Sequence, residues 1–313
     1  MTLTELKYIV AVARERHFGR AAEACFVSQP TLSVAVKKLE DELDVKIFER
    51  GASEVSVTPL GEQIVRQAQQ VLEQANAIKE IAKSGKDPVS GPLKLGIIYT
   101  IGPYLLPDLV REAIARVPQM PLMLQENFTA KLLEMLRTGE LDCAIMAEPF
   151  PDTGLAVAPL YDEPFVAAVP AGHPLAKRKQ LSAEELKNET MLLLGTGHCF
   201  RDHVLEVCPE YARFASPNSV GGEGIRKSFE GSSLETIKYM VASGMGVTVV
   251  PQLSLPKEPP SRHDHVRYIK FASPVPTRRV VLAWRRSFPR YEAIAALRNC
   301  IYACPLPGVK RLT

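Results

Sequence analysis

The sequence predicts an α/β protein with an N-terminal winged helix-turn-helix, a long linker helix, and a two-lobed domain with mostly parallel sheets. Three observations support this fold class. Short amphipathic helices separated by a tight turn open the chain, an unbroken helical pattern of about 27 residues follows, and strands alternate with helices from Leu93 onward. With 313 residues, 46% of them hydrophobic and 23% charged, the chain suits two or three globular units.

The first helices are predicted at residues 5–13 and 19–25, and a third follows the turn FVSQ. In the third helix, apolar residues recur at spacings of four, three and four, which indicates one buried face. These residues are Leu32, Val36, Leu39 and Leu43. Ser28 is suited to cap this helix and Pro30 to its first turn, because a helix start leaves N–H groups unpaired. Two short strands around GASE, within residues 46–57, predict a wing.

The linker helix begins at Thr58-Pro59, a cap followed by a proline, and its apolar pattern continues to about Ser84. Such a helix is about 40 Å long. Because a small domain cannot bury a stripe of that length, we expect a partner chain to cover it. The predicted divisions are a winged helix-turn-helix over 1–58, a dimerisation helix with a hinge over 59–88, and a C-terminal domain over 92–306.

From Leu93 the chain alternates between strands and helices. LKLGIIY, PLMLQEN and LDCAIMA are predicted strands separated by helices, which indicates parallel pairing. A second series contains MLLLG, a helix with the capping box Ser232-Ser233-Leu234-Glu235, and GVTVVP. The late strand RRVVLAW is expected to return to the first sheet, before a closing helix at 290–303. We expect a cleft between lobe I, about 92–163 and 268–306, and lobe II, about 164–267.

The side of the third helix opposite its apolar stripe carries residues that suit DNA. Ser, Thr and Gln bond to base edges or phosphates, Lys binds phosphate, and a recognition helix reads bases with its N-terminal residues. Charge gives no support, since residues 1–57 hold eight Lys or Arg against nine Asp or Glu. A solvated helix face explains these residues equally well when the helix is taken alone. The wing and linker helix favour DNA, with contacts expected at Ser28, Gln29, Pro30, Thr31, Ser33, Lys37, Lys38 and, at the wing, Arg50.

The segment LLLGTGHCFRDHVLEVCPE places Cys199 where a helix begins after a strand and a Gly-Thr-Gly turn. The helix start, His198 and Arg201 favour a thiolate, the form that attacks peroxide to give a sulfenic acid. Cys208 lies nine residues on, which is about 13.5 Å along a helix. Because bonded cysteines have α-carbons within about 7 Å, a disulfide between these two requires the segment to unwind. Pro209 disfavours helix at Cys208 and leaves it at a frayable end.

Two other interpretations of this segment remain open from the residues alone. Free cysteines are most often buried packing residues, and that role is as well supported here as a redox role. The histidines and cysteines of the segment are also zinc-ligand types, but their spacing matches no common zinc pattern, so we expect no metal. The other cysteines have ordinary roles: Cys25 and Cys143 in cores, and Cys300 with Cys304 on the last helix.

The segment HFGRAAEACFVSQPTLSVAVKKLEDELDVKIFER, followed by TPLGE, resembles the N-terminal signature of the LysR-type transcriptional regulators. The resemblance covers the whole architecture and implies a sensor domain similar to periplasmic binding proteins. It further implies double-stranded operator DNA and RNA polymerase as partners. The chain is then expected to form a homodimer or a homotetramer, the latter as a dimer of dimers.

GHCFRD with Cys208, GPYLLP, SLETI and MVASGMGV resemble the peroxide-sensing activators of that family. This resemblance implies that hydrogen peroxide is the signal in oxidative stress, that Cys199 is the peroxidatic cysteine and that Cys208 is the resolving one. Disulfide formation is then expected to refold the sensor and change operator binding. No cofactor is implied. The implied peroxide pocket contains Thr100, Thr129, His198, Asp202 and Arg279.

The two threonines also have support from the residues themselves. Each follows a predicted strand and opens a helix, which places it at the cleft where ligands of such folds bind, although N-capping explains them too. For the arginine, one residue of register separates Arg279 from Arg278. Residues 211–231 are rich in Gly and Ser and longer than the corresponding loop of relatives, which affects the path of the rearranging segment.

Two other functions remain for this architecture: a regulator that binds a small metabolite in the cleft, and a thiol peroxidase. The helix-turn-helix disfavours the peroxidase, so we expect a regulator without enzymatic activity. MTLTELKYIVAVARERH lacks the basic start and cleavage site of a signal peptide, and no apolar run approaches about 18 residues. Six cysteines are too few for a secreted disulfide scaffold. We therefore expect a cytoplasmic protein without membrane contact.

Overall fold

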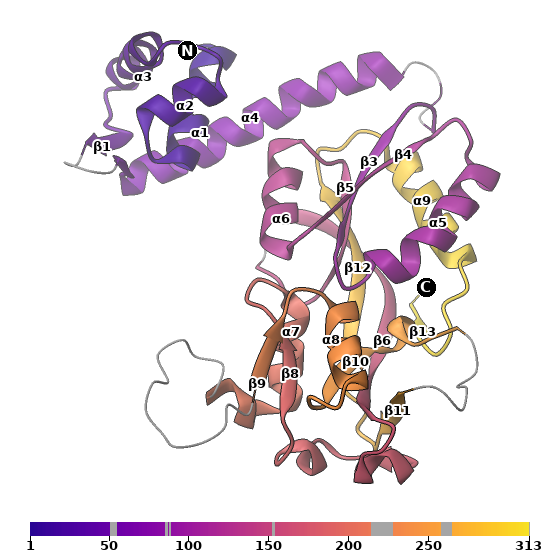
Figure 1. Cartoon of the computed structure of the whole chain (residues 1–313). Helices are drawn as coiled ribbons and strands as arrows, with labels where there is room; N and C mark the ends of the chain where they lie inside the picture. Colours follow the sequence, from indigo (N-terminus) through magenta and orange to yellow (C-terminus); the bar gives the residue numbers. More distant parts are fainter. Residues whose placement is uncertain are drawn as a thin grey trace. The chain divides into compact units, whose positions relative to one another are not determined.

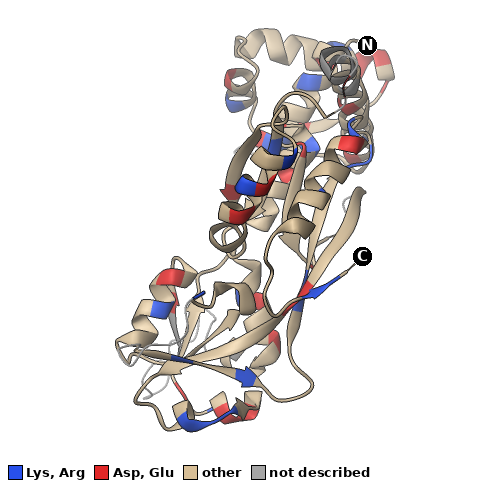
Figure 2. Ribbon diagram, turned by 90° about the vertical axis from the view of Figure 1, so that its right-hand side faces the viewer, with Lys and Arg blue, Asp and Glu red and all other residues tan. Residues whose placement is uncertain are grey.

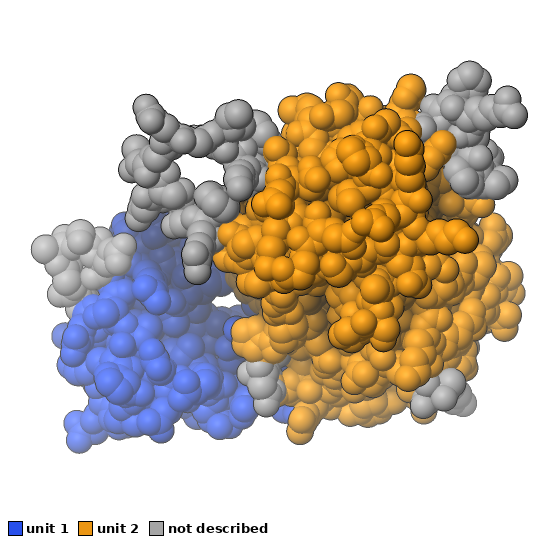
Figure 3. All heavy atoms as spheres, turned by 90° about the horizontal axis from the view of Figure 1, so that it is seen from below, with its two compact units in different colours: residues 1–86, 137–139, 287–289 blue, residues 87–136, 140–286, 290–313 orange. Residues whose placement is uncertain are grey.

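A computed structural model of the chain describes residues 1–50, 55–84, 87, 89–151, 154–213, 228–257 and 265–312. The chain divides into two compact units (Figure 3). The first comprises Met1–Lys86, Arg137–Gly139 and Ser287–Pro289, and the second comprises Asp87–Leu136, Glu140–Arg286 and Arg290–Thr313. Within the described ranges, no helix combines the length and apolar character needed to cross a membrane.

The N-terminal unit contains the predicted helix-turn-helix and two wing strands (Figure 1). Ile9 and Leu32 lie at the centre of its core with no exposed surface. Leu43, predicted to be buried, is 37% exposed, because the third helix ends there and Asp44 adopts a left-handed conformation (φ 52°). The GASE tip of the predicted wing lies outside the described residues. The elements are α1 Leu3–Glu15, α2 Phe18–Ala24, α3 Gln29–Leu43, β1 Phe48–Arg50 and β2 Val55–Val57.

Side-chain hydrogen bonds fix both ends of α3. At its start, the Ser28 hydroxyl accepts from the backbone N–H of Thr31 at 3.3 Å, which confirms the predicted cap. Near its end, the buried carboxylate of Glu40 accepts from the backbone N–H groups of Ile47 and Phe48 at 2.8 and 3.0 Å. The wing is therefore held against α3 by a charged acceptor that has little contact with water.

The linker helix α4 spans Pro59–Ser84, the predicted length. Of its apolar residues, Ala68 is buried against the helix-turn-helix core. Leu60, Val71 and Ile78 are 48, 38 and 69% exposed. An exposed apolar stripe along a 26-residue helix agrees with a partner chain, which stays a prediction.

The second unit opens with the predicted alternation of strands and helices. The strands β3, β4 and β5 pair in parallel, with β3 between the other two. Gly139 ends the second helix in a left-handed conformation (φ 78°). The bounds are β3 Leu93–Ile98, α5 Gly102–Arg116, β4 Leu122–Asn127, α6 Thr129–Thr138 and β5 Cys143–Ala147.

Two long strands connect the lobes of this unit. The 16-residue strand β6, Leu155–Pro170, pairs antiparallel with β12, Thr277–Arg285, over its first part and with β10 and β11 over its second part. Parallel pairing thus occurs in the βα segments and between β11 and the short strand β7, whereas the two crossing strands β6 and β12 run in opposite directions. The sheet order is β4-β3-β5-β12-β6-β11-β7, with β10 and β13 also on β6. The remaining bounds are β7 Gln180–Leu181, β10 Thr248–Pro251, β11 Val266–Phe271 and β13 Lys310–Arg311.

The second lobe packs helices α7 and α8 around the parallel pair of β8 and β9. The cap of α8 is Ser233, which accepts from Thr236 N at 3.2 Å. The helix thus begins one residue later than predicted, and Glu235 does not occupy the third helical position that a capping box requires. Among the described residues, four short 3-10 turns, η1 to η4, complete the connections. The bounds are η1 Pro174–Lys177, η2 Ala183–Leu186, β8 Met191–Leu194, α7 Cys199–Val207, η3 Pro209–Arg213, β9 Ser228–Gly231, α8 Leu234–Ala242, η4 Gln252–Ser254 and α9 Tyr291–Ala303.

Candidate functional site

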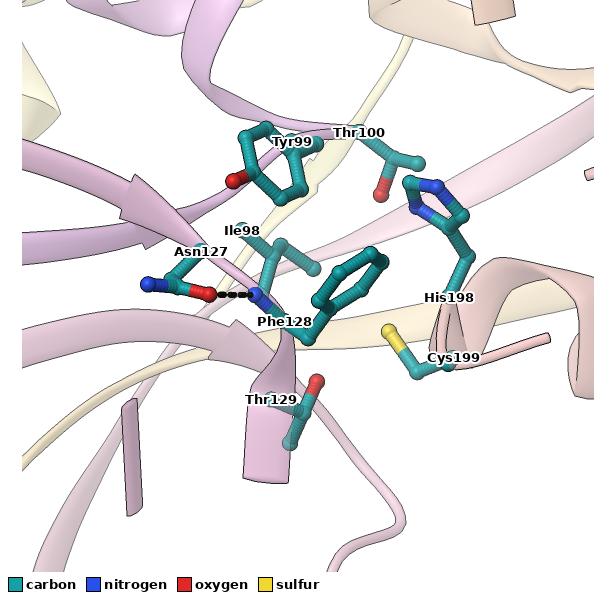
Figure 4. A pocket seen from close by; sticks show the side chains of 9 residues that line it. Ile98, Tyr99, Thr100, Asn127, Phe128, Thr129, His198 and Cys199 are labelled. Atoms are coloured by element: carbon teal, nitrogen blue, oxygen red, sulfur yellow. Dashed lines mark hydrogen bonds between the residues drawn. The ribbon is translucent and has the colours of Figure 1, made fainter. Parts of the chain in front are cut away.

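A small pocket lies where the carboxyl ends of β3 and β4 meet the start of α7 (Figure 4). Because β3 and β4 are parallel neighbours, the residues that follow them lie at one edge of the sheet. The turn after β8 brings the third group of residues to this edge. The pocket is lined by Ile98, Tyr99, Thr100, Asn127, Phe128, Thr129, Gly197, His198 and Cys199.

Cys199 is the first residue of α7, and its side chain is half-buried at the pocket wall. Figure 4 shows its sulfur directed toward the ring of Phe128. The backbone N–H groups of a helix start are donors that stabilise negative charge, here at the sulfur. Arg201 was expected to favour the thiolate, but its guanidinium donates to Leu194 O at 2.7 Å and pairs with Glu230 at 2.7 Å. The helix start therefore carries the argument for a reactive sulfur.

Both predicted threonines line the pocket with their hydroxyl groups placed differently. Thr100 Oγ1 accepts from Arg278 Nη1 at 2.8 Å. Since arginine only donates, the hydroxyl proton of Thr100 remains available for another acceptor. Thr129 Oγ1 is buried and has no hydrogen-bond partner among the described residues. An orphaned polar atom in a pocket wall indicates a place for a polar ligand or water.

Arg278, and not Arg279, reaches the threonine, which corrects the expectation for Arg279. Arg278 and Glu163 form a buried ion pair, with Nη2 and Oε2 2.8 Å apart and both side chains 1% exposed. Arg279 lies on the surface, 47% exposed, and pairs with Asp162 at 2.8 Å. The reason is the alternation of side chains along β12, since one residue of register moves a side chain to the opposite face.

Of the other two predicted pocket residues, His198 lines the pocket and Asp202 does not. His198 lines the pocket, is 8% exposed, and lies edge-on to the Phe128 ring at 4.8 Å between centroids. Burial lowers the pKa of His198, which favours its neutral form. Asp202 is exposed in the first turn of α7 and does not line the pocket, because its position on the helix directs it outward.

Sequence reasoning missed the aromatic part of the pocket. The rings of Tyr99 and Phe128 pack edge to face at 5.3 Å, and Tyr99 also contacts His198 at 5.9 Å. A signal was present, because an aromatic residue immediately precedes each of the two threonines that follow β3 and β4. A residue next to a ligand group at a strand end shares the same edge of the sheet.

Cys208 lies at the opposite end of α7, as its C-cap, and is fully buried in the core of the second lobe. Burial raises the pKa of its thiol to about 12. The two cysteines are free and separated by the full nine-residue helix, about 13.5 Å along its axis. The expected spacing is confirmed, and this conformation holds the sulfurs too far apart to bond.

The residues of this segment do not converge as zinc ligands. His203 is 4% exposed and its Nε2 lies 2.8 Å from the carbonyl oxygen of Glu148. No group of three His, Cys, Asp or Glu side chains in the described ranges could hold a metal ion. Elsewhere, Cys304 Sγ donates to Cys300 O at 3.2 Å, and both residues are buried.

Most of the residues expected to contact DNA are exposed on the N-terminal unit. In the view of Figure 2, Lys and Arg are interspersed there with Asp and Glu. Lys38 lies 3.7 Å from Glu5, and Ser33 is half-buried. The side chain of Arg50 lies outside the described residues, as do 214–227, most of the predicted long loop. The exposed members of the set are Ser28, Gln29, Pro30, Thr31, Lys37 and Lys38.

Comparisons with known proteins agree with both units. Residues 3–62 match the family of bacterial regulatory helix-turn-helix proteins of the lysR type, and residues 86–303 match the LysR substrate binding domain. A hydrogen peroxide-inducible genes activator of Pectobacterium carotovorum is 39% identical over 94% of this chain and 95% of its own length.

Two solved structures are similar along most of the chain. A full-length OxyR variant from Pseudomonas aeruginosa is 51% identical, with a TM-score of 0.71, and the match covers 97% of this chain and 95% of that one. A hydrogen-peroxide-bound OxyR mutant from Corynebacterium glutamicum is 33% identical, with a TM-score of 0.61, and the match covers 96% of this chain and 91% of that one. With a helix-turn-helix unit and a sensor unit that both match, the chain belongs to the LysR family of bacterial transcriptional regulators.

Proposed function

We propose that this protein is a DNA-binding transcription regulator that senses hydrogen peroxide through Cys199 and Cys208. The observation that carries the proposal is the placement of Cys199 at a helix start, in a very small pocket that also holds the Thr129 hydroxyl, which has no hydrogen-bond partner in the described part of the chain. Relatives named as hydrogen peroxide-inducible genes activators, over nearly the full chain, support the same conclusion.

The size of the pocket favours peroxide over a metabolite. The centre of a water-sized molecule has about 10 Å³ in which to lie, which is room for roughly one such molecule. Hydroxyl groups of Thr100 and Thr129 and the ring of His198 provide polar contacts for the two oxygen atoms of hydrogen peroxide. A metabolite of ordinary size requires a cavity many times larger.

The first chemical step oxidises Cys199 by two electrons. Its thiolate attacks one oxygen of hydrogen peroxide, a sulfur–oxygen bond forms, the oxygen–oxygen bond breaks, and the leaving hydroxide takes a proton to become water. The Thr100 hydroxyl, whose oxygen is held by Arg278, is placed to donate a hydrogen bond to the leaving oxygen. The product is a sulfenic acid on Cys199.

The second step joins Cys208 to the oxidised sulfur. The Cys208 thiol attacks the sulfenic sulfur, a disulfide forms, and the hydroxyl leaves as water. Because α7 separates the two residues, this step requires α7 to unwind and Cys208 to leave the core. The refolded segment then changes how sensor domains meet, which alters operator binding and activation of RNA polymerase.

The remaining parts of the proposal concern organisation and location. We assign 1–58 to DNA binding, 59–88 to dimerisation and the hinge, and 92–306 to redox sensing. The exposed residues at the start and along the outer face of α3, together with Arg50 at the wing, are assigned to operator DNA. The exposed stripe of α4 supports a homo-oligomer, a dimer or a dimer of dimers. We propose that this regulator acts in the cytoplasm and has no enzymatic activity.

The test treats the full-length protein with one equivalent of hydrogen peroxide, maps disulfides by mass spectrometry and compares operator footprints before and after. We expect one new disulfide, Cys199 to Cys208, and a changed footprint. The Cys199→Ser variant should lose both, whereas Cys300→Ser, a matched control at another buried cysteine, should keep both. A normal peroxide response in Cys199→Ser contradicts the proposal and favours a metabolite as the signal. Sustained peroxide turnover with a thiol reductant, without operator binding, indicates a peroxidase instead.

A further inference from the structure

We propose that the rings of Tyr99 and Phe128 form a cover that restricts the sulfur of Cys199 to hydrogen peroxide and keeps out hydroperoxides with an organic substituent. The inference rests on the proposed function, the oxidation of Cys199 by peroxide. It adds a specificity determinant that lies in the pocket wall but takes no part in the chemistry.

The two rings stand at the boundary between the pocket and solvent. Tyr99 and Phe128 are 39 and 38% exposed, whereas His198, the third aromatic ring of the pocket, is 8% exposed. All three rings contact one another edge to face, with centroids 4.8 to 5.9 Å apart. Because each ring supports the other two, neither outer ring turns aside without the loss of two aromatic contacts.

The backbone around Phe128 is also fixed. Its N–H donates to Asn127 Oδ1 at 3.0 Å, and its carbonyl accepts from Leu132 N at 3.0 Å in the first turn of α6. On the opposite side, Gly197 has a left-handed backbone (φ 101°), and a β-carbon there would lie 3.4 Å from the Phe128 ring. The loop before Cys199 therefore lies beside the ring, at a distance where a β-carbon would make ordinary van der Waals contact.

The chemistry determines where a substituent has to go. The thiolate attacks the terminal oxygen of a hydroperoxide R–O–OH, the sulfur–oxygen bond forms, and the oxygen–oxygen bond breaks. The leaving alkoxide takes a proton and departs as the alcohol R–OH, so sulfur is oxidised and the peroxide reduced. The group R thus lies on the side away from sulfur. Figure 4 shows the Phe128 ring on that side, in the direction in which the sulfur points.

The space beside the sulfur is too small for such a group. About 10 Å³ is open to the centre of a water-sized molecule, which suits the smallest peroxide, while each added carbon requires the rings to give way. A tert-butyl group contains four carbons. The cover therefore slows the reaction with tert-butyl hydroperoxide much more than the reaction with hydrogen peroxide.

The test measures second-order rate constants for oxidation of the full-length protein by hydrogen peroxide and by tert-butyl hydroperoxide, with a probe that traps sulfenic acid. We expect Phe128→Ala to raise the ratio of the tert-butyl to the hydrogen peroxide rate constant at least about tenfold. Phe128→Leu, which keeps more of the side-chain volume, should give an intermediate ratio. Because a general disturbance of Cys199 changes both rate constants together, the ratio isolates the cover.

The matched control is Phe26→Ala, the same substitution at a phenylalanine that is 95% exposed in the other unit. It should leave both rate constants unchanged. A ratio in Phe128→Ala that stays constant or falls overturns the cover, and a fall indicates that the ring binds the substituent. Failure of hydrogen peroxide to oxidise Cys199 in the unaltered protein contradicts the proposed function instead, so the two failures are distinguishable.

Discussion

Replacement of Arg278 by methionine is expected to destabilise the C-terminal unit by about 3–5 kcal/mol, because it leaves the Glu163 carboxylate buried without its ion partner. Both side chains are 1% exposed, with Arg278 Nε and Nη2 at 2.9 and 2.8 Å from Glu163 Oε2. Arg278 also donates to the hydroxyl and carbonyl oxygens of Thr100 at 2.8 and 3.0 Å. Methionine keeps an apolar stem beside Phe200, whose ring lies 5.1 Å from the guanidinium, but provides no donor.

Burial of the ion pair determines how much stability the Arg278→Met variant loses. A pair of the same geometry on the surface contributes about 0–1 kcal/mol, because water solvates whichever charge is left. Here both side chains are buried from solvent, so the remaining charge carries most of the cost. A second substitution, Glu163→Gln, removes that charge and keeps an oxygen that accepts from Leu253 N, now at 2.8 Å. The double variant is therefore expected to be more stable than Arg278→Met alone.

The assay is urea unfolding followed by the fluorescence of Trp284, the one tryptophan of the chain, which lies on β12 together with Arg278. Arg279→Met is the matched control, since Arg279 is adjacent, exposed and paired with Asp162 on the surface. Its free energy of unfolding should stay nearly unchanged. Equal losses at the two arginines, or a double variant no more stable than Arg278→Met, would refute the assignment of a buried ion pair.

Three further outcomes follow from the structure. Burial lowers the pKa of His203 below the usual 6.5, so its neutral form stabilises the fold above about pH 6.5 and this contribution is lost as the pH falls. In urea unfolding, the difference in the free energy of unfolding between the unaltered protein and His203→Gln should therefore become smaller from pH 7.5 to pH 5.5. Gly197→Ala should lower the free energy of unfolding by about 1–2 kcal/mol, because Gly197 has a φ of 101°, which alanine adopts only with strain. The strained turn before Cys199 should also slow oxidation of this residue, as measured by sulfenic acid trapping. Lys37→Ala should weaken binding to all DNA sequences alike and reduce the salt dependence of log K by about 1 in titrations at several salt concentrations.

The elements that sequence reasoning predicted well are those set by local chemistry. The cap at Ser28, the proline in the next turn and the length of α4 depend on residues close in sequence, and the structure has each of them. The same holds for Cys199, because a strand, a glycine turn and a helix start are all local signals. Short-range patterns therefore placed the reactive sulfur at a helix start.

The errors occurred where long-range packing decides the result. Arg278 and Arg279 are equivalent in sequence, and only the register of β12 against β6 shows which one faces Glu163. Similarly, no local pattern shows that Asp202 lies outside the pocket. The aromatic cover was missed because Tyr99 and Phe128 are far apart in the chain and meet only through the parallel pairing of β3 and β4.

The contrast between the two cysteines orders the chemistry in time. Cys199 is half-buried at a pocket, whereas Cys208 has no exposed surface and a thiol whose pKa burial raises to about 12. In this conformation peroxide therefore reaches the first sulfur and not the second. Unwinding of α7 also exposes Phe200 and Val204, which are 1 and 3% exposed, at a cost of about 1.5–3 kcal/mol each.

That cost keeps the reduced form intact until a sulfenic acid is present. Unwinding without oxidation loses the core contacts of α7 and the hydrogen bond from His203 to the Glu148 carbonyl, with no new bond in return. Once Cys199 is oxidised, each opening of the helix can be captured by Cys208 as a covalent bond. A helix that opens rarely thus suffices for the switch, since the disulfide holds the open form after a single encounter.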